Sequence, residues 1–477
     1  MNVAVVVLDT ARATDAVGGG PDIMPHLSRL AAAGTPFTRA YTTAPWTLPS
    51  HASLFTGTYT SSHGAHGDHT ELRRDVPTLP ETLQAAGYET VGHSNNTWIS
   101  GEFGFDRGFE TFRRGWQYRQ SETDLGPIAH ELDSVSKVKT ALSRVFQGNP
   151  LVNGLNLLYA MYRPDEGAAH TTDAVIRWLQ GRSGERPFFL FCNYLEPHIP
   201  YTPPRSFAEP FLPDGVDYEA ATAIRQDPRA FDVGEYDLTD HELSALLGLY
   251  RGELAYVDAQ LGRLITAMQS AGVWENTLLV VLGDHGENIG DHGFLGHQYN
   301  VYDTLLHVPL VVHGGPYTGG EAVENLVQLL DIPQTVCSVL GLEDTDHAEG
   351  PGRPLPPIGT GRDRIIAEYV APQPPVATLE ERFGDLPPRV RAWDRSLRTL
   401  RTNEWKLIRG SDGHTELYNV EADPAETVDQ SATATDTLAD LEGQLAAWRE
   451  ERPIQEAGGG VAVSQATAER LASLGYR

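Results

Sequence analysis

Short, continuous apolar runs recur along the chain, and helical patterns separate them. Val3–Leu8, Pro187–Cys192 and Thr277–Leu282 are rich in β-branched, aromatic and other apolar residues, as expected of strands buried on both faces of a sheet. The longest helical pattern, from His241 to Gly272, has an apolar stripe suited to packing on such a sheet. Strands that alternate with helices predict an α/β fold with a mostly parallel central sheet and helices on both faces.

Polar clusters closely follow these runs. One polar strand end is unremarkable, but the chain has four: Asp9-Thr10, Asn95-Asn96, Glu196-Pro197-His198 and Asp284-His285. Ligands of open α/β sheets bind outside the carboxyl ends of the strands. The four clusters therefore predict one shared rim of carboxylates, imidazoles and amides.

A candidate nucleophile lies at the start of a predicted short helix. Thr47 comes two places before Pro49, which is favoured in a first helical turn, and the helix is expected to end near Gly57. Two interpretations of Thr47 are open: a side chain that caps a surface helix, or a hydroxyl at a site for an anionic ester. The stretch alone favours the cap, and the four polar strand ends favour the site.

Two aspartates and a histidine around a hydroxyl make a hard, oxygen-rich site for one divalent ion. Asp9, Asp284, His285 and Thr47 supply these groups, and the expected ion is Ca, Mg or Mn, with Zn possible. A metal there would lower the pKa of the threonine hydroxyl and neutralise an ester oxygen.

The leaving group of an ester needs a proton, and three histidines are the available donors. They are His51, His198 and His297. With an ordinary pKa near 6.5 they can act as acids near neutral pH, and a bound anion would raise that pKa further. The alternative for each is a histidine that only supports the site.

The charge balance excludes several partners. The formal net charge is -28, from 64 acidic and 36 basic residues, so nucleic acid and anionic membranes are expected to be repelled. Such a surface suits solubility at high salt, which predicts a halophilic source.

No apolar run is long enough for stable membrane insertion. No signal-peptide pattern precedes the first strand, so the expected location is cytoplasmic.

Two units are expected along the chain. Residues 1–360 form the catalytic α/β domain, in which 111–168 reads as an insertion or lid. Residues 361–477 form a smaller antiparallel α+β subdomain, because a hairpin signal at Asp412-Gly413 and a helix at Thr435–Arg449 follow there.

Several longer motifs occur together with these residues. They are Leu8-Asp9-Thr10, Thr47-Leu48-Pro49-Ser50-His51, Phe103-Gly104-Phe105-Asp106-Arg107-Gly108-Phe109, Pro197-His198-Ile199-Pro200-Tyr201, Gly283-Asp284-His285-Gly286-Glu287 and Trp405-Lys406-Leu407-Ile408-Arg409. With them the chain resembles the sulfatase family of the alkaline phosphatase superfamily over nearly its whole length.

The resemblance implies roles for these residues. Asp9, Asp284 and His285 fall on metal-ligand positions, and Thr47 falls on the nucleophile, itself a ligand. Thr10 holds a further metal position, where relatives carry an acid. His198 and His297 fall on contacts to the substrate anion, and Asn95 and Asn96 are expected to help bind the substrate.

The chain departs from the family at two positions. Typical sulfatases carry Cys or Ser at the position of Thr47, which becomes formylglycine, and Arg at the position of His51. Threonine cannot become formylglycine, because its extra methyl group would leave a ketone. Family members with an unmodified threonine include phosphodiesterases and phosphoglycerol transferases, which form a covalent phosphothreonine.

The expected function is a metal-dependent hydrolase of sulfate or phosphate esters with Thr47 as the direct nucleophile. Its substrate would be a small anionic ester: a sulfated or phosphorylated glycan, a lipid head or a small molecule. Two alternatives are a phosphodiesterase or phosphoglycerol-type transferase, and a catalytically degenerate member that only binds an anionic ligand.

Overall fold

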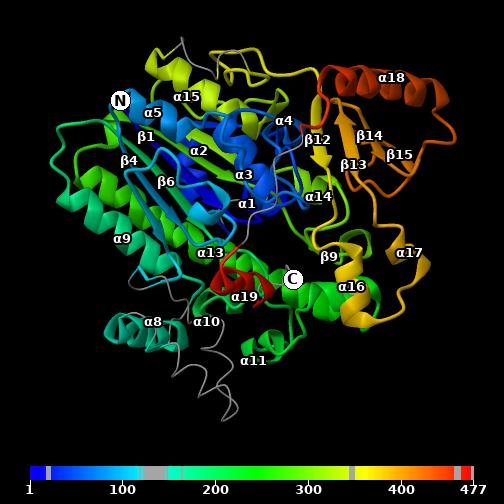
Figure 1. The fold of residues 1–477 in the computed structure, drawn as a ribbon, viewed down its shortest axis with the longest axis horizontal. Coiled ribbons are helices and arrows are strands. Elements are labelled where there is room, and N and C mark those ends of the chain that lie inside the picture. Colours follow the sequence, from blue (N-terminus) through cyan, green and yellow to red (C-terminus); the bar gives the residue numbers. More distant parts are fainter. Residues whose placement is uncertain are drawn as a thin grey trace.

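The central sheet has seven strands, in the spatial order β2-β10-β7-β1-β6-β4-β5 (Figure 1). The computed structural model describes residues 1–17, 23–117, 120–121, 145–146, 149–162, 165–342, 347, 350–455 and 463–473. The strands are β1 (Asn2–Leu8), β2 (Thr35–Pro36), β4 (Glu89–Ser94), β5 (Thr111–Arg114), β6 (Phe188–Tyr194), β7 (Thr277–Gly283) and β10 (Leu310–His313).

The pairing brings the ends of the central strands to one edge. β1 pairs in parallel with β6 and β7, and β4 pairs in parallel with β6 and β5. In this seven-stranded sheet β10 runs in the opposite direction, antiparallel to β7 on one side and to β2 on the other. Leu8 is in register with Tyr194 and with Gly283, so the polar residues that follow these strands emerge side by side. The predicted α/β fold with a mostly parallel sheet is confirmed.

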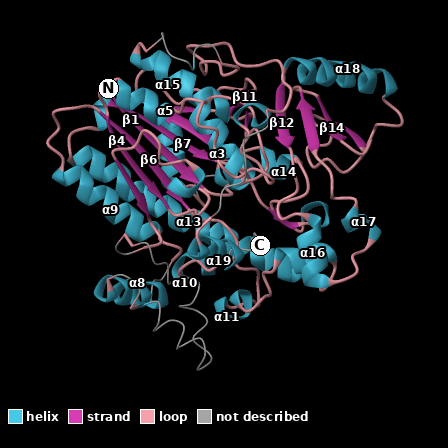
Figure 2. Ribbon diagram, in the orientation of Figure 1, coloured by secondary structure: helices cyan, strands magenta, loops and turns pink. Residues whose placement is uncertain are grey.

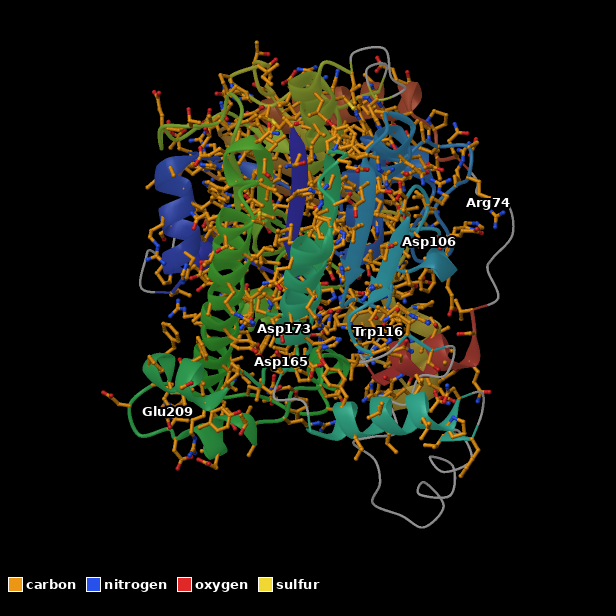
Figure 3. All side chains as sticks on the ribbon, turned by 90° about the vertical axis from the view of Figure 1, so that its left-hand side faces the viewer. Arg74, Asp106, Trp116, Asp165, Asp173 and Glu209 are labelled. Atoms are coloured by element: carbon orange, nitrogen blue, oxygen red, sulfur yellow. The ribbon has the colours of Figure 1, made fainter. Side chains whose placement is uncertain are left out.

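Helices cover both faces of the sheet, because alternate residues of β1 point to opposite sides. Val3, Val5 and Val7 share a core with α3 (Thr47–Thr56), α5 (Leu79–Ala85) and α15 (Ile332–Leu340). Ala4, Val6 and Leu8 share another with α2 (Pro25–Ala33), α9 (Ala168–Gly181) and α13 (Asp240–Ser270). Figure 3 shows α9, with Asp173, beside α13 on that second face.

Further helices and short strands surround this framework (Figure 2). The helices are α1 (Ala13–Ala16), α4 (Thr60–His63), α8 (Pro150–Tyr162), α10 (Arg205–Ala208), α11 (Tyr218–Thr222), α12 (Pro228–Val233), α14 (Asp303–Leu306), α16 (Val376–Phe383) and α17 (Pro388–Arg391), and the strands are β3 (Ala40–Tyr41), β8 (Asn288–Ile289), β9 (Leu295–Gly296) and β11 (Val327–Gln328). Across the described ranges, no helix combines the length and the apolar character needed to cross a membrane.

Part of the expected insertion belongs to the sheet. Thr111–Arg114, the start of the range 111–168, forms the edge strand β5 beside β4. Its residues are half-buried or exposed, so it lacks the apolar run that marks the central strands. Beyond it, α8 stands below the main body in Figure 3, and residues 122–144 lie outside the described ranges. A lid function for the range stays a prediction.

The second unit is a four-stranded antiparallel sheet. Its strands are β12 (Ile365–Tyr369), β13 (Leu397–Arg401), β14 (Trp405–Gly410) and β15 (Thr415–Asn419). Leu441, Leu445 and Trp448 of α18 (Thr435–Glu451) pack on it. The first strand of this sheet lies just after residue 360, where the sequence predicts the boundary of the subdomain.

The last described helix returns to the first unit. In α19 (Gln465–Ser473), Arg470 donates from Nε to the Thr97 hydroxyl at 3.0 Å and lies 4.9 Å from the centre of the Trp116 ring. Figure 3 shows Trp116 beside this helix. The C-terminal helix therefore packs next to the loop that follows β4.

Candidate active site

Helix α3 presents Thr47 to the strand ends. Trp46, not Thr47, is the N-cap residue, and no side chain caps the helix. The Thr47 hydroxyl lies 3.2 Å from His285 Nε2 and 3.4 Å from Asn96 Nδ2. Thr47 is fully buried. The interpretation of Thr47 as a surface cap is therefore wrong, and its hydroxyl faces the polar rim.

Asp9, Asp284 and His285 form a compact group beside this hydroxyl. One ligand atom from each lies within 4.8 Å of the others, and all three residues are buried. His285 Nε2 is 3.8 Å from Asp9 Oδ1 and 3.4 Å from Asp284 Oδ2. Neither of these carboxylate oxygens has a hydrogen-bond partner among the described residues. Two buried carboxylate oxygens and an imidazole nitrogen are a donor set that fits a hard divalent cation.

The two carboxylates have opposite electrostatics. Burial, and then the charge of Asp284, raise the pKa of Asp9 well above its usual range. Burial also disfavours charge on Asp284, but His285 and His51 outweigh it and lower its pKa to about 2. Two acids this close hold two negative charges only when a positive charge lies between them. The pair therefore has the electrostatics of a cation site.

Backbone contacts hold the group in place. Thr10 has a left-handed backbone, with φ of 60°, and its N–H donates to Asp284 Oδ1 at 3.1 Å. His285 Nδ1 lies 2.9 Å from the Gly286 carbonyl; a hydrogen bond there makes Nδ1 the donor and leaves Nε2 as the basic nitrogen that faces Thr47. The hydroxyl of Thr10, the expected further ligand, has no described hydrogen-bond partner.

His51 lies one helical turn after Thr47. Its Nδ1 is 2.9 Å from the Thr47 carbonyl and 3.3 Å from Asp284 Oδ2. The ring is fully buried, and its Nε2 has no hydrogen-bond partner in the described residues. The structure thus places His51 against the Asp284 carboxylate of the group formed by Asp9, Asp284 and His285.

The other two histidines continue from His285 in a row. The ring centre of His297 is 4.6 Å from that of His285 and 5.0 Å from that of His198. His297 Nδ1 is 2.8 Å from Glu287 Oε1, which fixes the ring. Burial lowers the pKa of His198 to about 4 and that of His297 well below its usual value. Both rings are therefore neutral near pH 7 in this structure.

The two asparagines predicted to bind the substrate lie on different sides of the chain. Asn96 donates from Nδ2 to Asp9 Oδ2 at 2.6 Å and lies beside Thr47. Asn95 instead accepts at 2.6 Å from the hydroxyl of Thr171 on α9. The structure brings Asn96 into the site and turns Asn95 away from it, because successive side chains of an extended chain point to opposite sides.

Two supporting residues were not expected. Ser50 donates from its hydroxyl to the Asp284 carbonyl at 2.6 Å, and Glu287 orients His297. The sequence offered a signal for each: Ser50 is spaced one helical turn from Thr47, and Glu287 is the last residue of the Asp-His-Gly-Glu motif.

Comparisons with known proteins show which family and which fold the chain resembles. A family model described as Sulfatase matches residues 1–342. Arylsulfatase K of Bos taurus is 24% identical over 471 residues, which cover 93% of this chain and 81% of the relative. Among solved structures, the phosphonate monoester hydrolase of Agrobacterium radiobacter superposes with a TM-score of 0.68 at 22% identity, covering 94% of this chain and 96% of that one. BT1596, a 2-O GAG sulfatase, superposes with a TM-score of 0.67 at 18% identity, covering 94% and 92%.

Proposed function

The chain belongs to the sulfatase family, and we propose that it is a metal-dependent hydrolase of sulfate or phosphate esters with Thr47 as its nucleophile. The observation that carries the proposal is the buried Thr47 hydroxyl, 3.2 Å from His285 Nε2 at the edge of the Asp9, Asp284 and His285 group. A helix cap does not need such partners, and a nucleophile does.

The proposed reaction has two displacements. The Thr47 hydroxyl gives up its proton to water, and Oγ1 forms a bond to the sulfur or phosphorus of the ester. The bond from that atom to the leaving oxygen breaks, and the leaving oxygen takes a proton from His198 or His297. Water then cleaves the threonine ester, which releases sulfate or phosphate and restores the hydroxyl. The unprotonated Nε2 of His285 faces the hydroxyl, and Asn96 orients it from the other side.

Asp9, Asp284 and His285 would hold the divalent ion, which is Ca, Mg or Mn, with Zn as a further candidate. When bound, such an ion neutralises charge on the ester oxygens. His198 and His297 are proposed to contact the anion and to protonate the leaving oxygen. A bound anion favours their charged forms, which offsets the burial that lowers their pKa.

The proposed substrate is a small anionic ester, with sulfated or phosphorylated glycans as the leading class. One structural neighbour is a GAG sulfatase by its name, and another is a phosphonate monoester hydrolase. Because threonine cannot give the aldehyde of typical sulfatases, phosphate esters are favoured within this class. A phosphodiesterase or phosphoglycerol-type transferase is the alternative that the same argument supports. The cytoplasmic location and the halophilic source stay predictions from the composition.

Thr47→Ala tests the nucleophile. Aryl sulfate, aryl phosphate and a phosphate diester are offered to the protein with Mg, Mn, Ca or Zn. We expect the turnover rate of Thr47→Ala to be at least about a thousandfold lower than that of the unaltered protein. Thr47→Ser should keep part of the unaltered turnover rate. Thr56→Ala is the matched control, since Thr56 lies at the other end of α3. Among the described residues its hydroxyl donates to the Ala52 carbonyl and otherwise contacts Thr58, both in its own segment.

Each outcome has a clear meaning. Full turnover by Thr47→Ala contradicts the nucleophile. If the unaltered protein binds these esters but turns none over with any ion, it is the degenerate, binding-only member. Transfer of the phosphoryl group to an added alcohol, in place of water, identifies the transferase.

A further inference from the structure

Two cavities flank the C-terminal half of α18, on the second unit. One has a volume of about 610 Å³ and lies between this helix and β13 and β14. The other, of about 520 Å³, lies between the helix and the segment that leads into β12. Arg452, just beyond the helix, lines both. Figure 1 shows α18 at the upper right, well apart from α3 and the strand ends.

Arginines dominate the walls of both cavities, although the chain as a whole carries a net charge of -28. Three acidic residues line the cavities, Asp363, Glu450 and Glu451. The seven arginines are Arg353, Arg362, Arg364, Arg398, Arg409, Arg449 and Arg452. A local excess of positive charge on so acidic a surface is a feature that needs its own explanation.

Three of these arginines are neutralised by carboxylates. Arg362 pairs with the buried Asp331, and Arg398 Nε lies 3.0 Å from Glu368 Oε1, which is fully buried. Arg409 Nε lies 3.3 Å from Glu442 Oε1. These pairs tie the cavity walls to the N-terminus of α15, to β12 and to α18, respectively, so the three arginines already have carboxylate partners.

The other four arginines form few ion pairs, and with the three lining acids Asp363, Glu450 and Glu451 counted against them the cavities keep an excess of one positive charge. In the described ranges, no carboxylate pairs with Arg353, Arg364 or Arg449, and Arg452 pairs only with its chain neighbour Glu451, at 2.8 Å. Arg364 donates to the neutral amide of Gln444 at 3.0 Å.

Attraction to the C-terminal end of a helix is the simplest other explanation for such arginines. It applies to Arg449 and Arg452, which lie at the end of α18. It does not account for Arg353 and Arg364, which precede β12 and come from outside the helix.

We propose that the two cavities form a second anion site, separate from Thr47, that binds a sulfated or phosphorylated glycan carrying more than one anionic group. The planar guanidinium forms paired hydrogen bonds to sulfate and phosphate oxygens, and each cavity has the size of a small-ligand site. Arg353 and Arg364 supply cations on one side of α18, and Arg449 supplies one on the other. Arg452 joins the two sides, so successive anionic groups of one chain find a cation in each cavity.

The choice of a glycan rests on the proposed function, whereas the anion site does not. A polymer held at the second unit would stay with the enzyme between turnovers, since one attached group raises the effective concentration of the others.

Binding is measured with dextran sulfate, tripolyphosphate and neutral dextran. The full-length Thr47→Ala protein is used, so that turnover does not interfere. A variant with Arg353, Arg364, Arg449 and Arg452 all changed to Ser is compared with a variant in which Arg74, Arg205, Arg225 and Arg391 are changed to Ser. The second set lies outside both cavities and changes the net charge equally.

We expect dextran sulfate to bind, neutral dextran not to bind, and the cavity variant to weaken binding at least tenfold while the charge-matched variant weakens it far less. Equal losses in the two variants, or none in the cavity variant, overturn the site. Binding of tripolyphosphate without dextran sulfate overturns the glycan assignment.

Turnover of a small aryl ester separates this proposal from the proposed function. With Thr47 restored, the cavity variant should turn over the aryl ester at the unaltered rate. A protein that binds dextran sulfate through these arginines but hydrolyses no ester keeps the anion site and loses the proposed function. Loss of aryl ester turnover in a folded cavity variant contradicts the separation of the two sites.

Discussion

Lys406 is a buried cation that ties the second unit to the first. It is 0% exposed, and its Nζ lies 2.7 Å from Asp303 Oδ1 and 2.6 Å from Glu426 Oε1. Arg401 holds the other oxygen of Asp303 at 3.0 Å. Burial disfavours charge on Asp303, but Lys406 and Arg401 outweigh it and hold its pKa far below its usual range. Lys406→Met should therefore leave two buried acids with one cation.

The size of the effect follows from these distances. At an effective dielectric constant of 20, each contact of Lys406 is worth about 6 kcal/mol before desolvation is subtracted. Removal of one partner from a buried ion pair costs about 3–5 kcal/mol net. Unfolding of the whole chain has an entropy of roughly 1 kcal/mol/K, so the midpoint should fall by about 3–5 °C. Should the second unit unfold alone, the smaller entropy would make its shift larger.

Asp303 also connects the Lys406 ion pairs to the candidate active site. Asp303 begins α14, and the carbonyl of Leu305 in that helix accepts from the N–H of Gly286 at 2.8 Å. Gly286 follows His285 in the chain, so a displaced α14 should also weaken ion binding. Calorimetry gives the stability, and the rise in melting temperature with added Mn gives the ion affinity.

A double variant tests the electrostatic reasoning. Lys406→Met combined with Glu426→Gln removes one cation and one anion and keeps the pair between Asp303 and Arg401. Burial raises the pKa of Glu426 to about 7, so the neutral amide suits its site. The double variant should recover at least half of the stability lost by Lys406→Met. A loss below about 1 kcal/mol for the single variant, or no recovery in the double variant, would refute the argument.

Two further predictions concern other buried acids. In protein freed of metal by a chelator, Asp9→Asn should raise the melting temperature, because the substitution removes repulsion from Asp284. Added Mn should raise the melting temperature of the unaltered protein but not that of Asp9→Asn, and a variant that still responds to Mn contradicts Asp9 as a ligand. Burial, and then Asp165, raise the pKa of Glu196 from 4.5 to about 8. The folded state therefore holds a proton that the unfolded state releases between these values, and stability from this group falls as the pH rises through that window. Glu196→Gln stays neutral, so its gain in denaturation midpoint over the unaltered protein should grow from pH 5 to pH 8 and then level; parallel pH profiles of the two proteins would count against the shift.

The sequence allowed the sheet and its polar edge to be predicted, because β1, β6 and β7 are uninterrupted apolar runs. A strand that is buried on both faces requires apolar residues at nearly every position. The edge strand β5 escaped detection for the opposite reason, since Thr111–Arg114 is partly exposed and has the composition of a loop. A local apolar pattern identifies a strand that is buried. An edge strand such as β5 forms by pairing with its neighbour β4, which the local sequence does not reveal.

Within the site, residue type was predictable and side-chain direction was not. Asn95 and Asn96 have the same chemistry, yet one contacts α9 and the other contacts Asp9. Thr47 had the sequence context of a helix cap, but His285, which is 238 positions away, lies beside its hydroxyl. A contact between residues this far apart depends on the packing of α3 on the sheet, which no local pattern contains.

His51 is an imidazole at a position where typical relatives carry a guanidinium. The guanidinium that typical relatives carry at this position is longer than an imidazole and is charged at every physiological pH. Nδ1 of His51 is 2.9 Å from the Thr47 carbonyl and 3.3 Å from Asp284 Oδ2, so this ring contacts both α3 and the group formed by Asp9, Asp284 and His285. We infer that His51 is a positioning residue, in place of the acid expected from the sequence. The proposed contacts with a substrate anion are then left to His198 and His297.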